Sequence, residues 1–282
     1  MTPRIIERGN GLPLVLVPGV QGRFEWGLPT VHALSGLGHV IAYSLADEPT
    51  SGFTWQASKG FENYLDQLDD VIRRTGAERP VLVGISYGGL IAAEYAARHP
   101  GAVRGLVVAS SPPPAWTLPA RAQRYLAAPA LMAPVFWLGA PMRAYPELKA
   151  AIPDPRARLQ FVIDHGLRIA GAPASSARMV RRLRWLESAR FSTSRSLALP
   201  ALVVTGEPDL EHVVPPDATR QYLQWLPKAR LVTLERTGHA GTVTRSRDFA
   251  DCVSSWLREL PDGPVPAGPV SHLEPARADR VS

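Results

Sequence analysis

Cysteine is nearly absent from this chain: Cys252 is the only one among 282 residues, so no internal disulfide can form. No run approaches the roughly 18 consecutive apolar residues of a membrane-spanning helix, and the N-terminus lacks the apolar stretch of a secretory signal. The sequence also shows no metal-ligand spacing and no DNA- or RNA-binding motif. We therefore expect a cytoplasmic protein that has no transmembrane segment, needs no metal or other cofactor and binds no nucleic acid.

Charge is moderate overall but unevenly distributed. Charged residues make up 20% and hydrophobic residues 45%, which is ordinary for a globular protein and excludes wholesale disorder. Between positions 111 and 195 there are thirteen Lys or Arg residues against four Asp or Glu residues. Two interpretations stay open. We favour a solvated basic face over a patch that attracts an anionic substrate, carrier or surface.

Short β-rich runs alternate with helical patterns in the first hundred residues, as in a mostly parallel central sheet with helices on both faces. Strands are predicted, from their continuous apolar character, at 14–17, 39–43, 81–83 and 106–108. Two further strands are predicted later in the chain, at 201–205 and 230–234. Amphipathic helices are predicted at 61–74 and 247–260. The predicted fold class is therefore α/β.

A helix-rich, proline-punctuated stretch interrupts this alternation after Ser111-Pro112-Pro113-Pro114. We predict one core domain formed by residues 1–110 and 192–260, with an inserted helical segment at 111–191. The tail at 261–282 is rich in Pro, Gly, Ala and charge, and too poor in apolar residues to offset the entropy lost on ordering. We expect this tail to be disordered.

The strongest chemical signal is a serine between two glycines at the end of a predicted strand. The segment Val81-Leu82-Val83-Gly84-Ile85-Ser86-Tyr87-Gly88 leads from a buried strand into a helical pattern, and so sharp a turn needs glycine on both sides of Ser86. Such a turn presents the hydroxyl at the C-terminal edge of the sheet, beside the free N–H groups of a helix start. Ser86 is therefore the candidate nucleophile.

A serine hydroxyl is a poor nucleophile at neutral pH and needs a base within hydrogen-bond reach. His239 lies in Thr237-Gly238-His239-Ala240-Gly241, directly after a predicted strand, where a loop can return to the same edge of the sheet. The imidazole in turn needs a carboxylate that fixes its tautomer. The loop after 201–205 offers three acids: Glu207, Asp209 and Glu211.

With these motifs in the order serine, acid, histidine, the chain resembles the α/β-hydrolase family over about residues 1–260. In that family the acid follows a glycine by three positions and precedes a short stretch that ends in Val-Pro. Counting from the glycine selects Asp209, whereas counting back from Val214-Pro215 selects Glu211. We favour Glu211, because the Val-Pro end leads into the next helix and should hold the acid better than the lengthened start; Asp209 is the alternative.

The resemblance also implies an oxyanion hole and a lid. Two backbone N–H groups would form the oxyanion hole: that of Tyr87, directly after the nucleophile, and one from the loop after the first core strand. In that loop Val20 is our first choice and Gln21 the second. The insertion at 111–191 matches the position at which family members carry a helical lid over the active site.

Four aromatic residues are candidates for the substrate pocket. Phe24 and Trp26 could equally belong to the core, and Phe136 and Trp137 could line an acyl pocket or pack the lid onto the core. Glu25 is expected to be solvated or paired with a lid arginine rather than catalytic.

A basic amphipathic helix is predicted at 178–186, which could meet an anionic carrier or surface, although arginines in solvent explain it equally well. The sequence thus predicts a serine hydrolase that cleaves a carboxylic ester or related acyl bond of a small, apolar substrate. Ser86 would form the acyl intermediate and His239 would act as base and then as acid. A thioesterase, an acyltransferase or a C–C bond hydrolase on the same residues stays open, as does a non-catalytic ligand-binding member of the fold.

Overall fold

The computed structural model describes residues 5–114, 116–188, 192 and 196–260, so the tail predicted at 261–282 lies outside the described residues. One sheet has the strand order β1-β3-β2-β4-β5-β6-β7. The strands are β1 (Ile5–Arg8), β2 (Pro13–Val17), β3 (His39–Tyr43), β4 (Val81–Ile85), β5 (Gly105–Ala109), β6 (Ala201–Thr205) and β7 (Ala229–Thr233). All neighbouring strands are parallel except β1 and β3, which confirms the predicted mostly parallel sheet.

The strand that the sequence analysis missed is β1, which pairs antiparallel with β3 at the edge of the sheet. Its first two residues are half-buried and the last two, Glu7 and Arg8, are exposed. Four residues of this character give no apolar run, whereas β5 and β6 are buried along their whole length. The central strands were therefore predictable from hydrophobicity, and the edge strand β1 was not.

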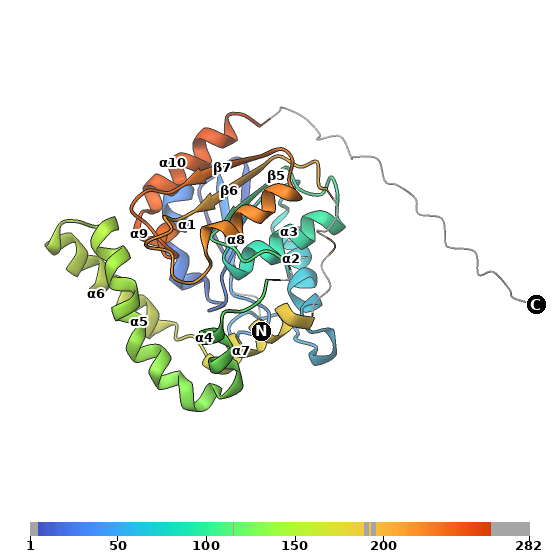
Figure 1. Cartoon of the computed structure of the whole chain (residues 1–282). Coiled ribbons are helices and arrows are strands. Elements are labelled where there is room, and N and C mark those ends of the chain that lie inside the picture. The colour runs from blue at the N-terminus through green and yellow to red at the C-terminus, as the bar shows by residue number, and fades with distance from the viewer. Residues whose placement is uncertain (1–4, 115, 189–191, 193–195, 261–282) are drawn as a thin grey trace, which may run out of the picture.

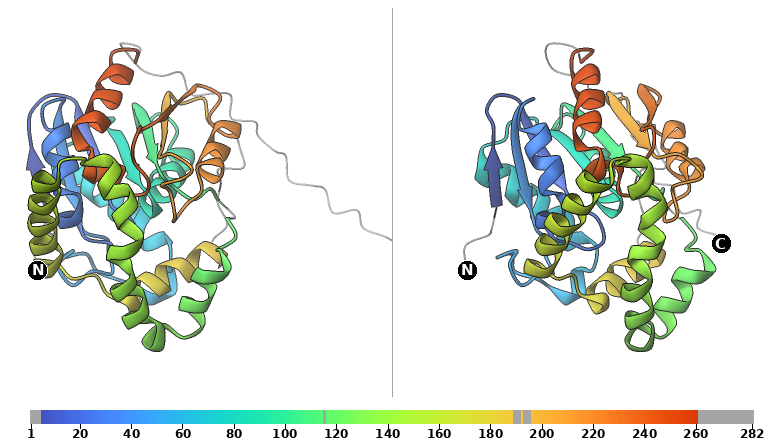
Figure 2. Two further views of the ribbon diagram at one scale, coloured as in Figure 1. Left: turned by 60° about the vertical axis from the view of Figure 1, so that its left-hand side comes forward. Right: turned by 90° about the vertical axis from the view of Figure 1, so that its left-hand side faces the viewer.

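Helices cover both faces of the sheet (Figures 1 and 2), as predicted. One face packs α1 (Leu28–Leu34) and α10 (Ser246–Leu257) over side chains that include Leu14 and Leu16. The other face packs α2 (Glu62–Thr75) and α3 (Tyr87–Arg98) over the alternate side chains, including Val15 and Val17. The shorter helical elements are η1 (Phe24–Gly27), η2 (Ala57–Lys59), α8 (Pro216–Arg220), η4 (Gln221–Gln224) and α9 (Gly241–Thr244).

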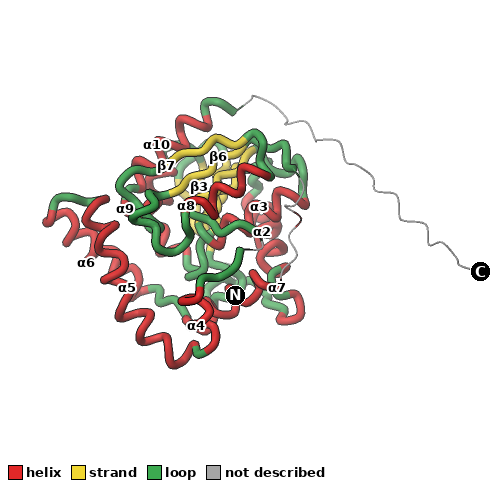
Figure 3. The backbone as a smooth tube through the Cα atoms, in the orientation of Figure 1, coloured by secondary structure: helices red, strands yellow, loops and turns green. Residues whose placement is uncertain are grey.

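Four consecutive helices lie between β5 and β6, within the insertion predicted at 111–191: α4 (Ala120–Ala127), α5 (Pro129–Ala151), α6 (Pro155–Gly171) and α7 (Ser176–Ser188). In Figure 3, α4, α5 and α6 lie outside the sheet and its covering helices, whereas α7 lies close to α2, where Trp185 contacts Tyr64. Their contacts with the core involve loops that follow strands: Trp26 after β2, Asp47 after β3 and Ala240 after β7. The inserted segment therefore faces the C-terminal edge of the sheet. None of the described helices has the length and hydrophobicity of a membrane span.

Candidate active site

Ser86 lies between β4 and α3 in a strained backbone conformation. Its φ is 53° and its ψ is −122°, a region that non-glycine residues rarely adopt. Two hydrogen bonds hold the turn: the N–H of Ser86 donates to Ala109 O at 2.8 Å, and its carbonyl accepts from the N–H of Gly89 at 2.9 Å. Strain of this kind persists only where the surroundings enforce it, and it is commonly found at functional sites.

The two flanking positions require glycine because backbone atoms of other segments leave no room there for a side chain. A Cβ at Gly84 would lie 2.5 Å from the Cα of Gly89, and a Cβ at Gly88 would lie 2.1 Å from the carbonyl oxygen of Val17. The glycine-serine-glycine spacing in the sequence thus reflects the packing of α3 directly against β4 and β2.

Ser86, His239 and Glu211 lie next to one another, although they come from three different loops. His239 Nε2 is 3.1 Å from Ser86 Oγ, and His239 Nδ1 is 3.2 Å and 3.3 Å from the two carboxylate oxygens of Glu211. Ser86 and Glu211 are buried, while the side chain of His239 remains 25% exposed. Asp209, the alternative acid, is exposed. Geometry therefore favours Glu211 as the partner of the imidazole.

Backbone N–H groups at the Val-Pro end of the loop hold Glu211. Val213 and Val214 donate to Glu211 Oε1 at 2.9 Å and 3.1 Å. Burial disfavours the ionised carboxylate, but His239 and these two N–H groups outweigh burial and lower the pKa of Glu211. An ionised Glu211 beside Nδ1 favours the tautomer that leaves Nε2 free to accept the proton of Ser86.

Two nearby carboxylates favour the protonated form of His239, which suits this residue to act as a base. Burial disfavours the imidazolium, but the charge and hydrogen bond of Glu211, together with the charge of Glu147, raise the pKa of His239 above its ordinary value. The imidazole can therefore take up a proton more readily than an isolated one.

The loop proposed for the oxyanion hole is held from two sides. Gly22 N–H donates to Gly19 O at 2.9 Å to close a turn, and Arg182 Nη1 of α7 donates to Val20 O at 2.7 Å. A Cβ at Gly19 would lie 3.4 Å from the Cβ of Ser86, so this loop passes directly beside the serine. Tyr87 begins α3, and the first N–H groups of a helix have no partner within the helix. The loop that carries Val20 and the start of α3 thus both adjoin Ser86.

The aromatic candidates separate into core and insertion contacts. Phe24 is only 3% exposed and packs among core residues under α1, which favours its core interpretation. Trp26 and Trp137 meet edge to face with ring centroids 6.2 Å apart, and Trp26 Nε1 donates to Ala172 O at 2.9 Å. The side chain of Phe136 lies outside the described part of the structure.

Three apolar residues near Phe136 and Trp137 in α5 face solvent rather than a pocket. Leu131, Val135 and Leu138 are 75%, 53% and 79% exposed, so they point into solvent from α5. Among the described aromatic contacts of this stretch, Trp137 is the one that joins α5 to the core-side Trp26.

Two expectations about charged residues are wrong. Glu25 is buried and accepts two hydrogen bonds from Arg23, at 2.9 Å and 3.2 Å, rather than facing solvent. Arg182 is fully buried and binds Asp47 and Glu48 instead of lying in solvent. Burial opposes the charge of Arg182, but these carboxylates raise its pKa. In both cases the partner neutralises the charge.

The basic character of α7 is also largely compensated by the core. Arg181 donates to Asp47 and Arg178 donates to Glu48, each at 3.0 Å. These contacts use the arginines of the predicted basic helix to hold the insertion to the core, which favours a structural role for them over binding of an anionic carrier or surface.

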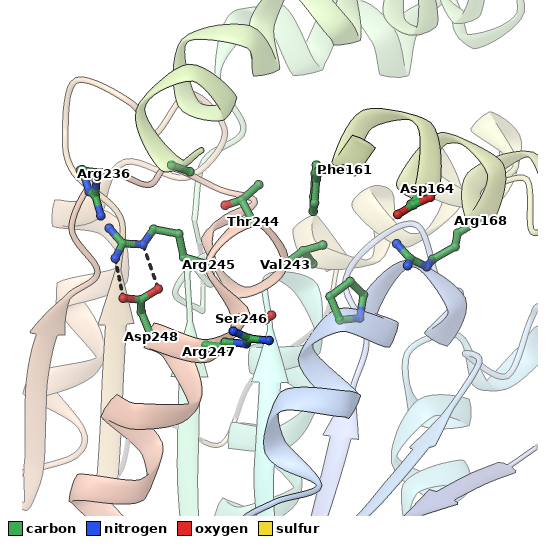
Figure 4. A pocket seen from close by; sticks show the side chains of 12 residues that line it. Phe161, Asp164, Arg168, Arg236, Val243, Thr244, Arg245, Ser246, Arg247 and Asp248 are labelled. Atoms are coloured by element: carbon green, nitrogen blue, oxygen red, sulfur yellow. Dashed lines mark hydrogen bonds and ion pairs between the residues drawn. The ribbon is translucent and has the colours of Figure 1, made fainter. Parts of the chain in front are cut away.

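A cavity of about 410 Å³ opens between α6 and the segment from α9 to the start of α10 (Figure 4). Arg245 and Asp248 form an ion pair in its wall. Neither Ser86 nor His239 lines it, so this cavity is separate from the candidate active site. Among the described residues, no group of three or more His, Cys, Asp or Glu side chains could hold a metal ion.

The residue that the sequence analysis missed is Glu147, in α5. It is buried, and its Oε2 accepts a hydrogen bond of 3.2 Å from the N–H of Ala240, the residue directly after His239. Its one signal in the sequence is that it is the only acid in the 23 residues of α5. An isolated acid in a long apolar helix could have attracted attention, but its partner could not have been identified.

Comparison with known proteins gives consistent matches. A sequence profile of the alpha/beta hydrolase family matches residues 14–252. The 2-hydroxymuconate semialdehyde hydrolase of Pseudomonas sp. (strain CF600) is 27% identical over 265 residues, covering 90% of this chain and 89% of that protein. The 2-(acetamidomethylene)succinate hydrolase of Mesorhizobium japonicum is 28% identical over 216 residues, 73% of this chain and 74% of that protein. The structure of an esterase from Exiguobacterium antarcticum has a TM-score of 0.71 at 18% identity, covering 90% of this chain and 94% of that chain.

Proposed function

The chain belongs to the alpha/beta hydrolase family and is an enzyme of the hydrolase type, and on this premise we propose that it cleaves a carboxylic ester or related acyl bond of a small, apolar substrate. The reaction would pass through an acyl-Ser86 intermediate. The observation that carries this proposal is the distance of 3.1 Å between Ser86 Oγ and His239 Nε2, with Glu211 on the other ring nitrogen.

In the proposed mechanism, Ser86 Oγ attacks the carbonyl carbon while His239 Nε2 takes the hydroxyl proton. The N–H groups of Val20 and Tyr87 would stabilise the negative oxygen of the tetrahedral intermediate. His239 then returns the proton to the leaving group, which departs and leaves the acyl-enzyme. A water molecule, deprotonated by His239, releases the acid and restores Ser86. Glu211 stabilises the imidazolium in both halves of the reaction.

We further propose that the inserted helices act as a lid and that Trp26 and Trp137 form part of the substrate pocket. The support is that the insertion contacts loops at the C-terminal edge of the sheet, where Ser86 lies. The edge-to-face pair of tryptophans bridges the core and the insertion. An apolar wall at this boundary would favour an apolar group on the substrate.

The named substrates of two relatives indicate which bonds to test. The substrate named for the Mesorhizobium japonicum relative carries an amide, which is an acyl bond. The compound named for the Pseudomonas relative has neither an ester nor an amide, so a hydrolase that acts on it must break a C–C bond. C–C bond hydrolysis by the same residues is therefore our second candidate, and a panel of esters, thioesters, amides and enol-acid ketones would separate the two.

A fluorophosphonate probe tests the proposed nucleophile directly. We expect the wild-type protein to be labelled at Ser86 and Ser86→Ala to lose labelling, because only an activated serine reacts with the probe. Ser110→Ala is the matched control, since Ser110 is another buried serine with a positive φ, of 44°, that follows a neighbouring strand. Equal labelling of wild type and Ser86→Ala would reject the proposal. Absence of labelling in a folded wild-type protein would favour a non-catalytic ligand-binding role.

Single replacements distinguish the two candidate acids. Glu211→Gln is expected to lower kcat by about 10⁴-fold, because a neutral amide neither stabilises the imidazolium nor fixes its tautomer. Asp209→Asn should stay within about twofold of wild type, because surface substitutions of this kind have small effects. Initial rates on an activated ester measure both. If Asp209→Asn were crippled and Glu211→Gln nearly normal, Asp209 would be the acid.

A further inference from the structure

Glu147 connects the inserted segment to the loop that carries His239. Its side chain reaches from α5 to the segment between β7 and α9, where Oε2 accepts from the N–H of Ala240 at 3.2 Å. On the other side of the histidine, a Cβ at Gly238 would lie 3.0 Å from the same oxygen. The carboxylate therefore contacts both neighbours of His239 in the chain.

The environment of Glu147 is an unfavourable one for a carboxylate. The residue is 5% exposed, and its second oxygen, Oε1, is buried without a hydrogen-bond partner among the described residues. No ion pair found within the described part of the chain includes it. A buried carboxylate that lacks a cation is destabilising, so its position next to a candidate catalytic loop points to a functional role.

We propose that Glu147 is a positioning residue for His239: its carboxylate fixes the loop on both sides of the histidine, and its negative charge acts on the imidazole. This inference rests on the proposed role of His239 as the base for Ser86. It adds a second carboxylate, contributed by the inserted segment, to the one that Glu211 provides from the core.

Among the described residues, three groups act on His239 from the surrounding elements. They are the Ser86 hydroxyl from the turn after β4, the Glu211 carboxylate from the loop after β6 and the Glu147 carboxylate from α5. Burial disfavours the imidazolium, but the two carboxylates outweigh it and raise the pKa of His239. Burial also raises the pKa of Glu147, although the N–H groups of Ala240 and Gly238 oppose that shift.

The sign of the resulting pH effect follows from the role of a base. A base works in its neutral form, so kcat/KM falls at low pH as His239 becomes protonated. Removing the negative charge of Glu147 would destabilise the imidazolium and lower the pKa of His239. The acid limb of the pH profile would then move to lower pH.

Two variants separate the hydrogen bond from the charge. Glu147→Gln keeps an oxygen that can accept from Ala240 but removes the charge, and we expect an acid limb lower by about half a pH unit with plateau kcat within about threefold of wild type. Glu147→Leu removes both, and kcat should fall by about tenfold or more with KM within about threefold, since the loop loses its anchor. The measurement is kcat and KM for an activated ester from about pH 5 to about pH 9.

Asp164→Asn is the matched control, because it neutralises another acid of the insertion whose described hydrogen bond is to Gln160. It should leave both the profile and kcat unchanged. Thermal unfolding of each variant shows whether it is folded, and if Glu147→Leu is unfolded the acid limb of Glu147→Gln decides the question. An unshifted acid limb in folded Glu147→Gln overturns the proposal. Retained activity in Ser86→Ala and His239→Ala would instead overturn the proposed function on which it rests.

Discussion

Ser86→Ala and His239→Ala are each expected to lower kcat on an activated ester by about 10⁶-fold, and the double variant by no more than either single variant. The two groups act as a unit: Nε2 lies 3.1 Å from Oγ and takes its proton as the hydroxyl attacks. Without the imidazole the hydroxyl is not activated, and without the hydroxyl the imidazole has no proton to take. Single-turnover rates of the three variants at saturating substrate measure the effect.

The double variant makes this test more demanding than either single replacement. If the two side chains contributed independently, the losses would multiply, and the double variant would be far slower than both single ones. Residual activity in the variants is expected from binding and the oxyanion hole alone. A loss below about tenfold in folded Ser86→Ala would assign the chemistry to another group.

The central sheet and the serine turn were predictable because their causes are local in the chain. Buried parallel strands need continuous apolar runs, and β5 and β6 show them. The turn at Ser86 needs glycine at two fixed positions, because backbone lies within 3 Å of any added Cβ at Gly84 and Gly88. Such constraints are visible in the order of residues, so neither a structure nor a comparison was required to find them.

The choice between Glu211 and Asp209 is one that a local sequence pattern could not decide alone. Both acids fit a count from one end of the loop, and the sequence favoured Glu211 only through the position of Val-Pro. In the structure, the N–H groups of Val213 and Val214 bind the carboxylate of Glu211. Counting from that end selects the acid that lies beside His239, because the residues before the proline hold its carboxylate.

The remaining contacts of the site could not be predicted, because their partners are far apart in the sequence. Glu147 and Ala240 are 93 positions apart, and Arg182 and Asp47 are 135 positions apart. An arginine in a basic amphipathic helix is usually solvated, and nothing near Arg182 in the chain marks it as buried. The fold alone brings it to the loops after β2 and β3.

Arg182→Met is expected to lower the free energy of unfolding by about 3 to 5 kcal/mol, because it leaves buried carboxylates without their main partner. The Arg182 side chain is fully buried, and Nη2 lies 2.5 Å from Asp47 Oδ1 and 2.6 Å from Glu48 Oε1. The side chains of Asp47 and Glu48 are 1% and 0% exposed. Methionine has a similar apolar stem but no donors. Urea unfolding measures the loss, and we expect the slope of the unfolding free energy against urea concentration to be unchanged.

Two comparisons show whether buried charge causes the loss. Arg181→Met removes another partner of Asp47 from the same helix, but the side chain of Arg181 is 44% exposed, so solvent screening should limit the loss to about 1 kcal/mol. Adding Asp47→Asn and Glu48→Gln to Arg182→Met should recover a large part of the stability, because neutral amides need no cation. No recovery would assign the loss to packing instead. Recovery would show that Arg182 serves to neutralise two buried core carboxylates, and that the apolar contacts of α7 hold it to the core once those charges are gone.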